Sequence, residues 1–380
     1  MTQVRVGLLG FSAKGSWAVV GHLPYFLSDA GKAKYTITAL AGSSLEAAQE
    51  AIEVYKLPPT TTAHGSPESL AADGNVDLVV VSVKTPHQYA VTKPILEAGK
   101  SVFVEWCFGN GLAESEELAA LARAKGVKTM IGTQGRQASA VQTAKQLVQD
   151  GAIGRVLYTE LSSTAALWGP TTDGKVTWQL QKKNGASMLE VYGGHLMECF
   201  STVVGEFASL NATLINTVPH LAVVDPNASR SPGAPAKTVA KDTPDQILIQ
   251  GTLVSGAAAS IHMGSDLTAD MMGTSSLWKI QGEKGRITLR NPTNGAIHVT
   301  DAEVVLEQIG VDGSVKVTET IPCPTSTYHT NIARAWDRFA TGQPGVDYPT
   351  FETGVIRKRF LEAIEKSAAT GQRTGYQTYL

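Results

Sequence analysis

The sequence feature that most constrains the fold is an apolar segment, residues 4–9, that leads directly into a glycine-containing loop and then a helical pattern. The loop reads Gly10-Phe11-Ser12-Ala13-Lys14-Gly15, a G-x-G-x-x-G spacing with serine at the middle position. In this spacing the first glycine permits a tight turn and the last permits close helix packing. Amide groups at the start of the helix can then bind a pyrophosphate. The loop therefore predicts a dinucleotide site formed by Gly10, Phe11, Ser12, Lys14 and Gly15.

Short apolar runs and helical patterns alternate through the first third of the chain. The runs are apolar on both faces, which is typical of buried parallel strands joined by helical crossovers. The strand candidates are Val4–Leu9, Thr36–Ala41, Asp77–Val83, Ser101–Glu105 and Lys128–Ile131. The helix candidates are Ser16–Leu27, Ser44–Tyr55, His87–Ala98 and Ala113–Ala124. This alternation predicts a doubly wound α/β domain of the Rossmann type over residues 1–133.

After Gly132 the pattern changes to strands separated by turn signals, with few helices. The strand candidates are Arg155–Ser163, Ser209–Ile215, Gln246–Leu253, Ala257–Met263, Leu277–Gln281, Arg286–Leu289 and Val315–Ile321. The helix candidates are Ala138–Asp150, Met188–Val203, Thr330–Ala340 and Phe351–Ser367. The predicted fold class is therefore α/β plus α+β, with a largely antiparallel open sheet in a second domain over residues 134–380. Residues 224–241 are rich in Pro, Ser and Ala and predict a long surface loop.

Composition excludes several classes of function. The chain has 32 Lys and Arg against 34 Asp and Glu, a formal net charge of −2. Nucleic acids and anionic membranes are bound by concentrated basic charge, so neither is an expected partner. No run of 18 apolar residues is present, and no membrane span is expected. The three cysteines are far apart and the histidines lack ligand spacing, so we expect no disulfide framework, no metal and a reducing, cytoplasmic location.

The end of the second predicted strand bears on the choice of cofactor. A carboxylate at this point binds the ribose 2′-hydroxyl of NAD, but the sequence Leu40-Ala41-Gly42-Ser43-Ser44 has no acid before Glu46. The hydroxyls of Ser43 and Ser44 and a helix N-terminus can accept a 2′-phosphate. NADP(H) is therefore favoured over NAD(H), although no Arg or Lys stands at this turn and NAD(H) remains an alternative.

Several strings carry a resemblance to a known family. They include Glu97-Ala98-Gly99-Lys100-Ser101-Val102-Phe103-Val104-Glu105, Gln134-Gly135-Arg136, Gly194-His195, Thr243-Pro244-Asp245 and Gly282-Glu283-Lys284-Gly285. With them the chain resembles, over nearly its whole length, the glucose–fructose oxidoreductase/inositol dehydrogenase (Gfo/Idh/MocA) family. Within that family it is most similar to the branch that contains the galactose-regulon repressor of yeasts.

The resemblance also identifies two departures. Dehydrogenases of the family have Glu-Lys-Pro where this chain reads Glu105-Trp106-Cys107, and that lysine assists proton transfer. Trp106 has a single N–H donor and cannot shuttle a proton. In the family's Asp-x-x-x-His motif, alignment on His195 places Val191 at the acid position, and the neighbouring Glu190 faces about 100° away on a helix.

The remaining polar residues define the candidate site. Tyr192 and His195 are three residues apart and share a helix face, which the resemblance directs at the nicotinamide, so both are candidate catalytic groups. The alternative is that they only pack in a closed cleft. Further candidates for cofactor binding are Ser43, Ser44, Lys84, Glu105 and Trp106. Candidates for the substrate pocket are Gln134, Arg136, Trp168, Trp178 and Glu190, which have alternative roles in packing or at the domain junction.

The sequence therefore predicts an NAD(P)-dependent oxidoreductase that transfers a hydride to or from a small organic substrate, such as a carbonyl, imine, enone or polyol. Two alternatives stay open. One is a non-catalytic NAD(P)-binding transcriptional regulator like the yeast repressor, and the other is a redox-neutral cyclase or isomerase. The resemblance also implies a homo-oligomer, a dimer or tetramer formed through the open sheet.

Overall fold

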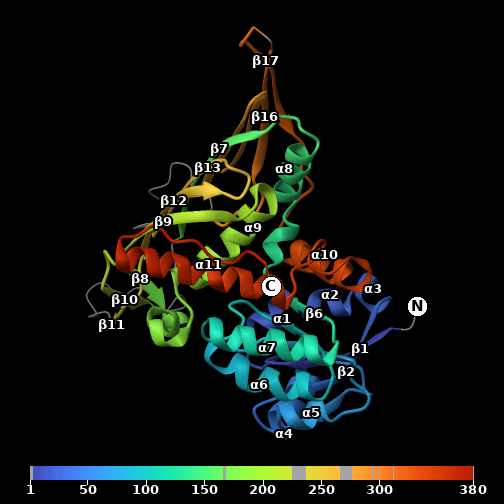
Figure 1. Ribbon diagram of the computed structural model, residues 1–380. Helices are drawn as coiled ribbons and strands as arrows, with labels where there is room; N and C mark the ends of the chain where they lie inside the picture. Colours follow the sequence, from blue (N-terminus) through green and yellow to red (C-terminus); the bar gives the residue numbers. More distant parts are fainter. Residues whose placement is uncertain are drawn as a thin grey trace. The chain divides into compact units, whose positions relative to one another are not determined.

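The computed structural model describes residues 3–165, 168–224, 237–265, 276–292, 295–298, 300–310 and 312–379 (Figure 1). The chain forms two compact units, one of residues 1–134 and 328–358 and the other of residues 135–327 and 359–380. The sequence analysis predicts a boundary at residue 133, and this division has its first boundary after residue 134. The prediction that everything after residue 133 forms the second domain differs from this division, because residues 328–358 return to the first unit.

The first unit contains a six-stranded parallel sheet in the order β3-β2-β1-β4-β5-β6. Its strands are β1 (Val4–Leu9), β2 (Tyr35–Ala41), β3 (Thr62–His64), β4 (Leu78–Val81), β5 (Ser101–Val104) and β6 (Thr129–Ile131). The strand order reverses between β1 and β4, which both pair in parallel with their neighbours. This is the doubly wound arrangement that the alternation of strands and helices predicts. The short edge strand β3 was not predicted.

The first unit contains helices that connect these strands and two helical segments from later in the chain. They are α1 (Trp17–Gly21), α2 (Leu23–Leu27), α3 (Asp29–Lys32), α4 (Leu45–Val54), α5 (Pro67–Ala71), α6 (Thr85–Glu97), α7 (Leu112–Lys125) and α10 (Tyr328–Thr341), with the start of α11 (Phe351–Thr370). The single helix predicted over residues 16–27 is wrong, because the helix ends at Gly21 and restarts with Pro24 in the first turn of α2. Proline lacks the N–H that a continuous helix would use at this point.

An aromatic core explains why α10 belongs to the first unit. Trp336 of α10 is fully buried, with its ring 4.9 Å from that of Phe26 and 5.0 Å from that of Phe103. Tyr35 of β2 donates its hydroxyl hydrogen to the backbone oxygen of Trp336 at 2.7 Å. The apolar stripe of α10 therefore packs on the parallel sheet. The sequence of the helix predicts an apolar face but does not indicate which sheet that face contacts.

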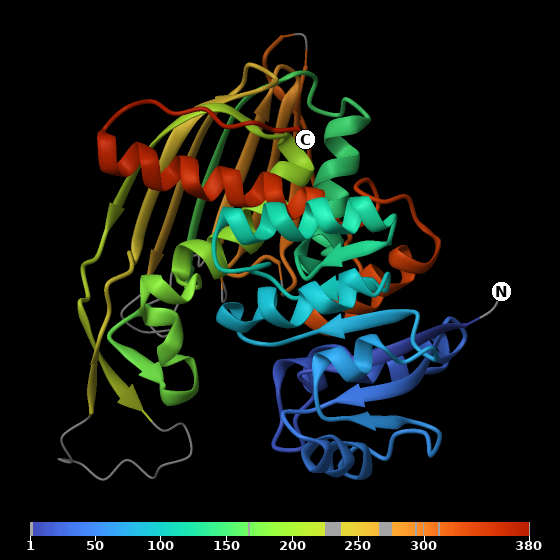
Figure 2. The same cartoon turned by 60° about the horizontal axis from the view of Figure 1, so that its bottom comes forward.

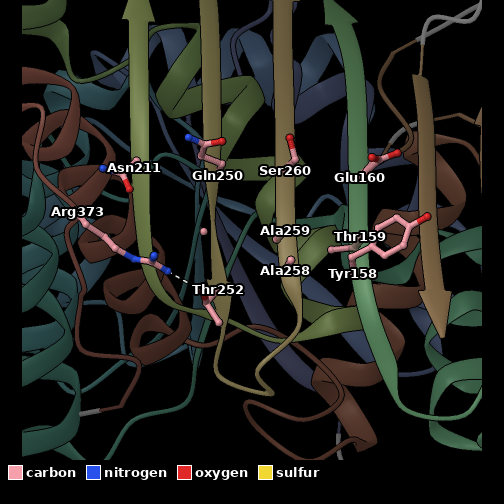
Figure 3. Close-up of a pocket in the computed structure, with 11 residues that line it drawn as sticks. Tyr158, Thr159, Glu160, Asn211, Gln250, Thr252, Ala258, Ala259, Ser260 and Arg373 are labelled. Carbon is pink, nitrogen blue, oxygen red and sulfur yellow. Dashed lines mark hydrogen bonds between the residues drawn. The ribbon is translucent and has the colours of Figure 1, made fainter. Parts of the chain in front are cut away.

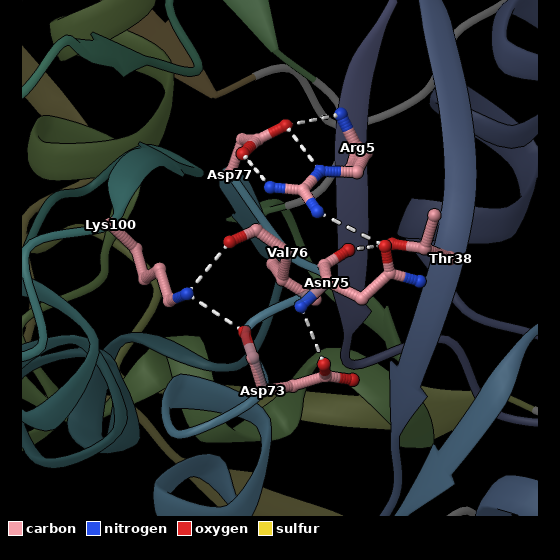
Figure 4. A network of polar contacts seen from close by, with 7 residues as sticks. All are labelled: Arg5, Thr38, Asp73, Asn75, Val76, Asp77 and Lys100. Atoms are coloured by element: carbon pink, nitrogen blue, oxygen red, sulfur yellow. Dashed lines mark hydrogen bonds and ion pairs between the residues drawn. The ribbon is translucent and has the colours of Figure 1, made fainter.

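A polar network joins the segment before β4 to the strands beside it (Figure 4). Arg5 of β1 binds Asp77 with two nitrogens, at 2.9 and 2.6 Å, and donates to the side chain of Asn75 at 3.1 Å. Thr38 of β2 donates to the backbone oxygen of Asn75, and Lys100 donates to the backbone oxygens of residues 73 and 76. Because this network lies before the start of β4, it fixes the edge of the sheet opposite the glycine loop.

The second unit is built on an eight-stranded sheet in the order β17-β16-β15-β14-β7-β13-β12-β9. The strands are β7 (Val156–Ala165), β9 (Phe207–Ile215), β12 (Gln246–Leu253), β13 (Ala258–Ser265), β14 (Ser276–Gly282), β15 (Gly285–Asn291), β16 (Glu303–Ile309) and β17 (Val315–Ile321). Only the β7–β13 pair is parallel, which confirms the expectation of a largely antiparallel sheet. Strand β16 was missed. A smaller sheet in the order β11-β10-β8 contains β8 (Thr171–Asp173), β10 (His220–Val224) and β11 (Thr238–Ala240).

Helices cover one face of the large sheet. Helices α9 (Gly194–Val204) and α11 lie against the large sheet (Figure 2). The ring of Phe200 in α9 lies 5.6 Å from that of Trp278 in β14, and the ring of Phe360 in α11 lies 5.7 Å from that of Phe207 in β9. The π-helical turn η5 (Met188–Gly193) precedes α9, and α8 (Ser139–Gln149) packs against α9. Along β13 exposed residues alternate with buried ones, so the other face of the sheet is exposed at this strand.

Two further predictions can be compared only with the residues that the structure describes. Of the loop predicted over residues 224–241, residues 225–236 lie outside the part of the chain that the structure describes. Among the described residues, no helix combines the length and the hydropathy of a membrane span.

Candidate functional site

The glycine loop lies at the carboxyl end of β1, where the strand order reverses. Gly10 has φ +94°, and a Cβ atom there would lie 2.1 Å from the backbone oxygen of Ser82, which follows β4. Only glycine fits this close approach. Gly15 also has a positive φ, +86°, but its Cβ position is open. A crevice at this reversal is where doubly wound sheets bind dinucleotides, and Gly10 has the geometry that a phosphate-binding turn requires.

Backbone contacts within the loop hold its shape. The amide of Gly15 donates to the backbone oxygen of Ser12 at 2.9 Å, and the amide of Lys14 donates to the Ser12 hydroxyl at 3.2 Å. Phe11 is buried beneath the loop, whereas Ser12, Lys14 and Gly15 are exposed. The exposed residues are available to a ligand, and Phe11 serves as the anchor.

The turn after β2 holds the two serines and a carboxylate. Ser43 is exposed, and the Ser44 side chain caps α4 by accepting the amide hydrogen of Ala47 at 3.2 Å. The pKa of Glu46 is lowered, first by its own backbone N–H and then by the Ser44 hydroxyl. A carboxylate therefore stands in the first turn of α4, close to the hydroxyls predicted to accept a 2′-phosphate.

A hydrogen-bonded chain fixes Glu105 at the end of β5. The indole N–H of Trp336 donates to Nδ1 of His22 at 3.0 Å, and because indole is only a donor, Nδ1 must accept. The ring proton of His22 is therefore on Nε2, which donates to Oε1 of Glu105 at 2.6 Å. Trp17 donates to the same oxygen at 2.7 Å. Both bonds reach Oε1, which orients the carboxylate at the edge of the sheet that carries the glycine loop.

Lys84 and Trp106 lie at the same edge. Lys84 is exposed at the N-terminus of α6, directly after β4, and Trp106 is nearly buried directly after Glu105. The predicted cofactor residues thus gather on one edge of the first unit. The sequence analysis missed the bond from His22 to Glu105, because nothing local to His22 identifies a partner 83 positions along the chain.

In the second unit, four rings form a continuous series. The imidazoles of His195 and His298 are stacked, with centroids 4.9 Å apart and planes 4° from parallel. The ring of Tyr192 lies 5.8 Å from that of His298, and Trp168 lies 6.4 Å from Tyr192. The structure therefore brings three predicted residues together and adds His298, which the sequence analysis considered only for metal binding.

Burial differs along this series. Tyr192, Trp168 and His298 are buried, whereas His195 is partly exposed. Desolvation, followed by the charge of His195, lowers the pKa of His298 well below its usual range. Gly135 permits the packing, since a Cβ atom there would lie 2.4 Å from Cβ of His298. His195 is thus the member of the series that a ligand can reach.

The hydroxyl of Tyr192 is hydrogen-bonded inside the unit. Ser163 of β7 donates to the backbone oxygen of Gly295 at 2.7 Å, so its single proton is used there and Tyr192 donates to Ser163. The backbone oxygen of Thr164 is a second acceptor for Tyr192, at 3.2 Å. Burial raises the pKa of Tyr192. These contacts orient the ring firmly and hold the phenol proton.

The other predicted pocket residues have different surroundings. Arg136 forms an ion pair with the fully buried Glu198 of α9 at 3.0 Å and contacts Thr202 at 3.2 Å. Gln134 is buried in the short 3₁₀ turn η1 (Gln134–Gln137). Glu190 accepts a hydrogen bond from Ser187 at the start of η5. Trp178 is half-buried in the 3₁₀ segment η3 (Gly174–Leu180), where its backbone oxygen accepts from Asn184 at 2.7 Å.

Comparison with known proteins identifies the family. Residues 4–133 match the family model described as "Oxidoreductase family, NAD-binding Rossmann fold", and residues 139–291 match "Gal80p, C-terminal domain". The dehydrogenase aclE of Aspergillus oryzae is 32% identical over 380 residues, which cover 99% of each chain. This chain belongs to the Gfo/Idh/MocA oxidoreductase family.

This Gfo/Idh/MocA chain is similar to proteins of two kinds, regulatory proteins and dehydrogenases. The galactose/lactose metabolism regulatory protein GAL80 of Saccharomyces cerevisiae is 28% identical over 76% of this chain and 69% of its own length. A crystal structure of a super-repressor mutant of Gal80p from the same yeast superposes with a TM-score of 0.85 at 25% identity, over 98% of both chains. The apo form of levoglucosan dehydrogenase has the same fold, with a TM-score of 0.79 at 20% identity over both whole chains.

The open face of the large sheet carries a shallow hollow of about 430 Å³ (Figure 3). Its lining includes Tyr158, Glu160, Asn211, Gln250 and Arg373. Arg373 lies along the sheet and donates to Ser209 at 2.7 Å and to Thr252 at 2.6 Å. Glu160 projects from β7 on the same face of the sheet. This Gfo/Idh/MocA chain therefore presents both signs of charge on its uncovered sheet face.

Proposed function

We propose that the protein is an NAD(P)-dependent oxidoreductase that transfers a hydride between a nicotinamide cofactor and a small organic substrate. The observation that carries this proposal is the glycine turn at the reversal of strand order, where Gly10 lies too close to Ser82 for any side chain. The full-length relationship to a protein named as a dehydrogenase supports it. A carbonyl, imine, enone or polyol fits a site that lacks the family's lysine and aspartate.

The first unit supplies the cofactor residues in this proposal. Amides of the glycine loop bind the pyrophosphate, and Lys84, Glu105 and Trp106 lie along the half of the sheet that holds the second nucleotide. The nicotinamide supplies the hydride chemistry when it is bound. We assign NADP(H) over NAD(H), because no acid ends β2, and we expect Glu46 to limit that preference because its carboxylate repels a 2′-phosphate.

His195 is the proposed acid–base group. An imidazole has the pKa range for proton transfer near neutral pH, and His195 is the accessible member of its ring series. Tyr192 is the second candidate donor, but its hydroxyl proton is held by Ser163 and Thr164 and a substrate has to compete with them. We therefore assign proton transfer to His195 and orientation to Tyr192.

Cofactor binding and turnover test the proposal together. The purified protein is titrated with the oxidised and reduced forms of both dinucleotides and then supplied with a panel of ketones, imines, enones and polyols. Loss of reduced nicotinamide with a ketone, imine or enone, or its formation from the oxidised cofactor with a polyol, supports the proposal. His195→Gln is expected to keep cofactor affinity and lower turnover by about 100-fold or more. Turnover that is unchanged in His195→Gln would remove the assigned role of His195.

A transcriptional regulator is the second candidate. It is favoured by Trp106, which cannot move a proton, and by the similarity to GAL80 and to Gal80p structures. This reading predicts dinucleotide binding without turnover. It also predicts recovery of a transcription activator from nuclear extract by the immobilised protein. Turnover with no such recovery would exclude it.

We also propose that the open face of the large sheet pairs with a second copy of the chain. A two-fold interface brings the same surface together from both copies, so Arg373 of one copy can meet Glu160 of the other. Arg373→Glu alone and Glu160→Lys alone are expected to weaken the oligomer in sedimentation analysis, and the double exchange is expected to restore it. Unchanged oligomers in both single variants would contradict this interface.

A further inference from the structure

Lys358 of α11 is a buried cation in the first unit. Its side chain is almost wholly inaccessible, with 3% of the residue exposed. Nζ lies 5.4 Å from the centre of the Trp106 ring and donates to the backbone oxygen of Gly109 at 3.0 Å. Within the part of the chain that the structure describes, Lys358 has no carboxylate partner. A buried ammonium with one neutral acceptor and one aromatic face is energetically costly.

The loop that receives Lys358 is held by several hydrogen bonds. It comprises residues 106–111, directly after β5, and Gln88 bridges it by donating to the backbone oxygen of Glu105 and accepting from the amide of Gly109, both at 2.8 Å. Ser115 donates to the backbone oxygen of Phe108 at 2.5 Å. The position of the charge relative to the end of β5 is therefore fixed.

The end of β5 belongs to the half of the sheet that takes the second nucleotide. The strand order reverses between β1 and β4, and β4, β5 and β6 form the half beyond the reversal. A dinucleotide lies across this reversal with one nucleotide over each half. The loop of residues 106–111, with the Lys358 charge against the Trp106 ring, thus follows the strand end that the proposed function assigns to the nicotinamide nucleotide.

The two redox forms of the cofactor differ in charge at that nucleotide. An oxidised nicotinamide ring carries a positive charge, whereas the reduced ring is neutral. We infer that Lys358 makes the protein bind the reduced dinucleotide in preference to the oxidised one. This inference rests on the proposed function, because it requires the nicotinamide nucleotide at the carboxyl end of β5.

Other charged groups near the loop do not account for the expected difference in affinity between the oxidised and reduced dinucleotides. The Glu105 carboxylate acts in the opposite direction, but His22 and Trp17 hold it on one oxygen, and it is the same in every Lys358 variant. Glu114 is bonded to the amide of Asn110 at 2.7 Å. Removing the Lys358 charge therefore isolates its own contribution.

The test is the ratio of dissociation constants for oxidised and reduced dinucleotide, measured by calorimetry with NADP⁺ and NADPH and again with NAD⁺ and NADH. A unit charge in partly screened surroundings predicts that Lys358→Met lowers this ratio by about fivefold to twentyfold. Lys358→Arg keeps the charge and is expected to retain the ratio. Lys125→Met, at the exposed end of α7, is the control for loss of net charge and is expected to change nothing.

The outcomes separate the inference from the proposed function. If wild type binds neither form of either dinucleotide, the proposed function fails. If both forms bind and Lys358→Met leaves their ratio unchanged, the inference is overturned while the proposed function stands. If Lys358→Met does not fold, as thermal denaturation would reveal, Lys358→Arg together with Lys358→Gln supplies the same comparison. An equal ratio in those two variants would also overturn the inference.

Discussion

The imidazole rings of His195 and His298 lie face to face, 4.9 Å apart and within 4° of parallel. The His298 ring also packs edge-on against that of Tyr192, and Gly135 leaves room for Cβ of His298. The accessible imidazole is therefore supported by one that burial keeps neutral. This contact orients the ring of His195, as the proposed proton transfer requires.

The lowered pKa of His298 predicts a pH dependence of stability. In the unfolded chain this histidine takes up a proton below about pH 6.5, whereas in the folded protein it stays neutral. The unfolded state then binds more protons, so this contribution to stability is present above about pH 6.5 and is lost as the pH falls. The loss approaches about 1.4 kcal/mol per pH unit. His298→Phe is expected to show a flatter decline in urea denaturation between about pH 7 and 5. Equal slopes in both proteins would contradict the assignment.

The two loop glycines form a matched pair. Gly10→Ala places a Cβ atom 2.1 Å from the Ser82 oxygen, whereas Gly15→Ala meets nothing within 4 Å and only has an unfavourable φ. We expect Gly15→Ala to cost about 1–2 kcal/mol and Gly10→Ala more than that, with loss of measurable dinucleotide binding. Chemical denaturation and calorimetric titration measure the two effects. Equal behaviour of the two variants would show that the Ser82 contact does not limit the turn.

Glu46 is expected to oppose the 2′-phosphate of NADP(H). Glu46→Gln removes a carboxylate from the first turn of α4 and leaves Ser43 and Ser44 in place. We expect the affinity for NADPH relative to NADH to rise about threefold to tenfold, because one exposed charge repulsion is lost. Glu50→Gln, one turn further along α4, is the control. A fall in the affinity for NADPH relative to NADH would contradict the proposed repulsion between Glu46 and the 2′-phosphate.

A buried ion pair in the second unit predicts a large effect on stability. Lys241 and Asp245 are both inaccessible, and Asp245 also accepts from the amides of Thr217 and Val218 at 2.8 to 3.0 Å. Asp245→Asn leaves the Lys241 ammonium buried without its counter-ion and is expected to cost about 3–5 kcal/mol. Lys241→Met with Asp245→Asn should cost less than Asp245→Asn alone. A larger loss in the double variant would contradict the electrostatic explanation.

Regular elements with strong periodicity were predictable from the sequence. Strands β1, β12 and β17 have the bounds that their apolar patterns predicted, and the reversal of strand order follows from the alternation of strands and helices. The helix predicted over residues 188–203 is present, but its first part is the π-helical turn η5. The hydrophobic pattern alone does not distinguish a π-helical turn from an α-helix.

The contacts that define the site were less predictable. His298 lies in an irregular segment between β15 and β16, where periodicity carries no information, and its stacking on His195 depends on the space beside Gly135. The bond from Trp336 to His22 joins residues 314 positions apart. Lys358 lies within a predicted helix, and the sequence pattern of that helix does not indicate that its charge is buried. In each case the partner is set by tertiary packing, which local sequence does not encode.

The most direct test of the central claim follows a hydride from the cofactor. NADPH and NADH carrying deuterium at C4 are supplied with the substrate class that responds in the panel, and the product is analysed by mass spectrometry and NMR. Hydride transfer predicts one deuterium per product molecule at the reduced carbon, with one equivalent of oxidised cofactor formed, and a much slower transfer in His195→Gln. Product that forms without deuterium while the cofactor stays reduced would contradict it and identify a redox-neutral reaction.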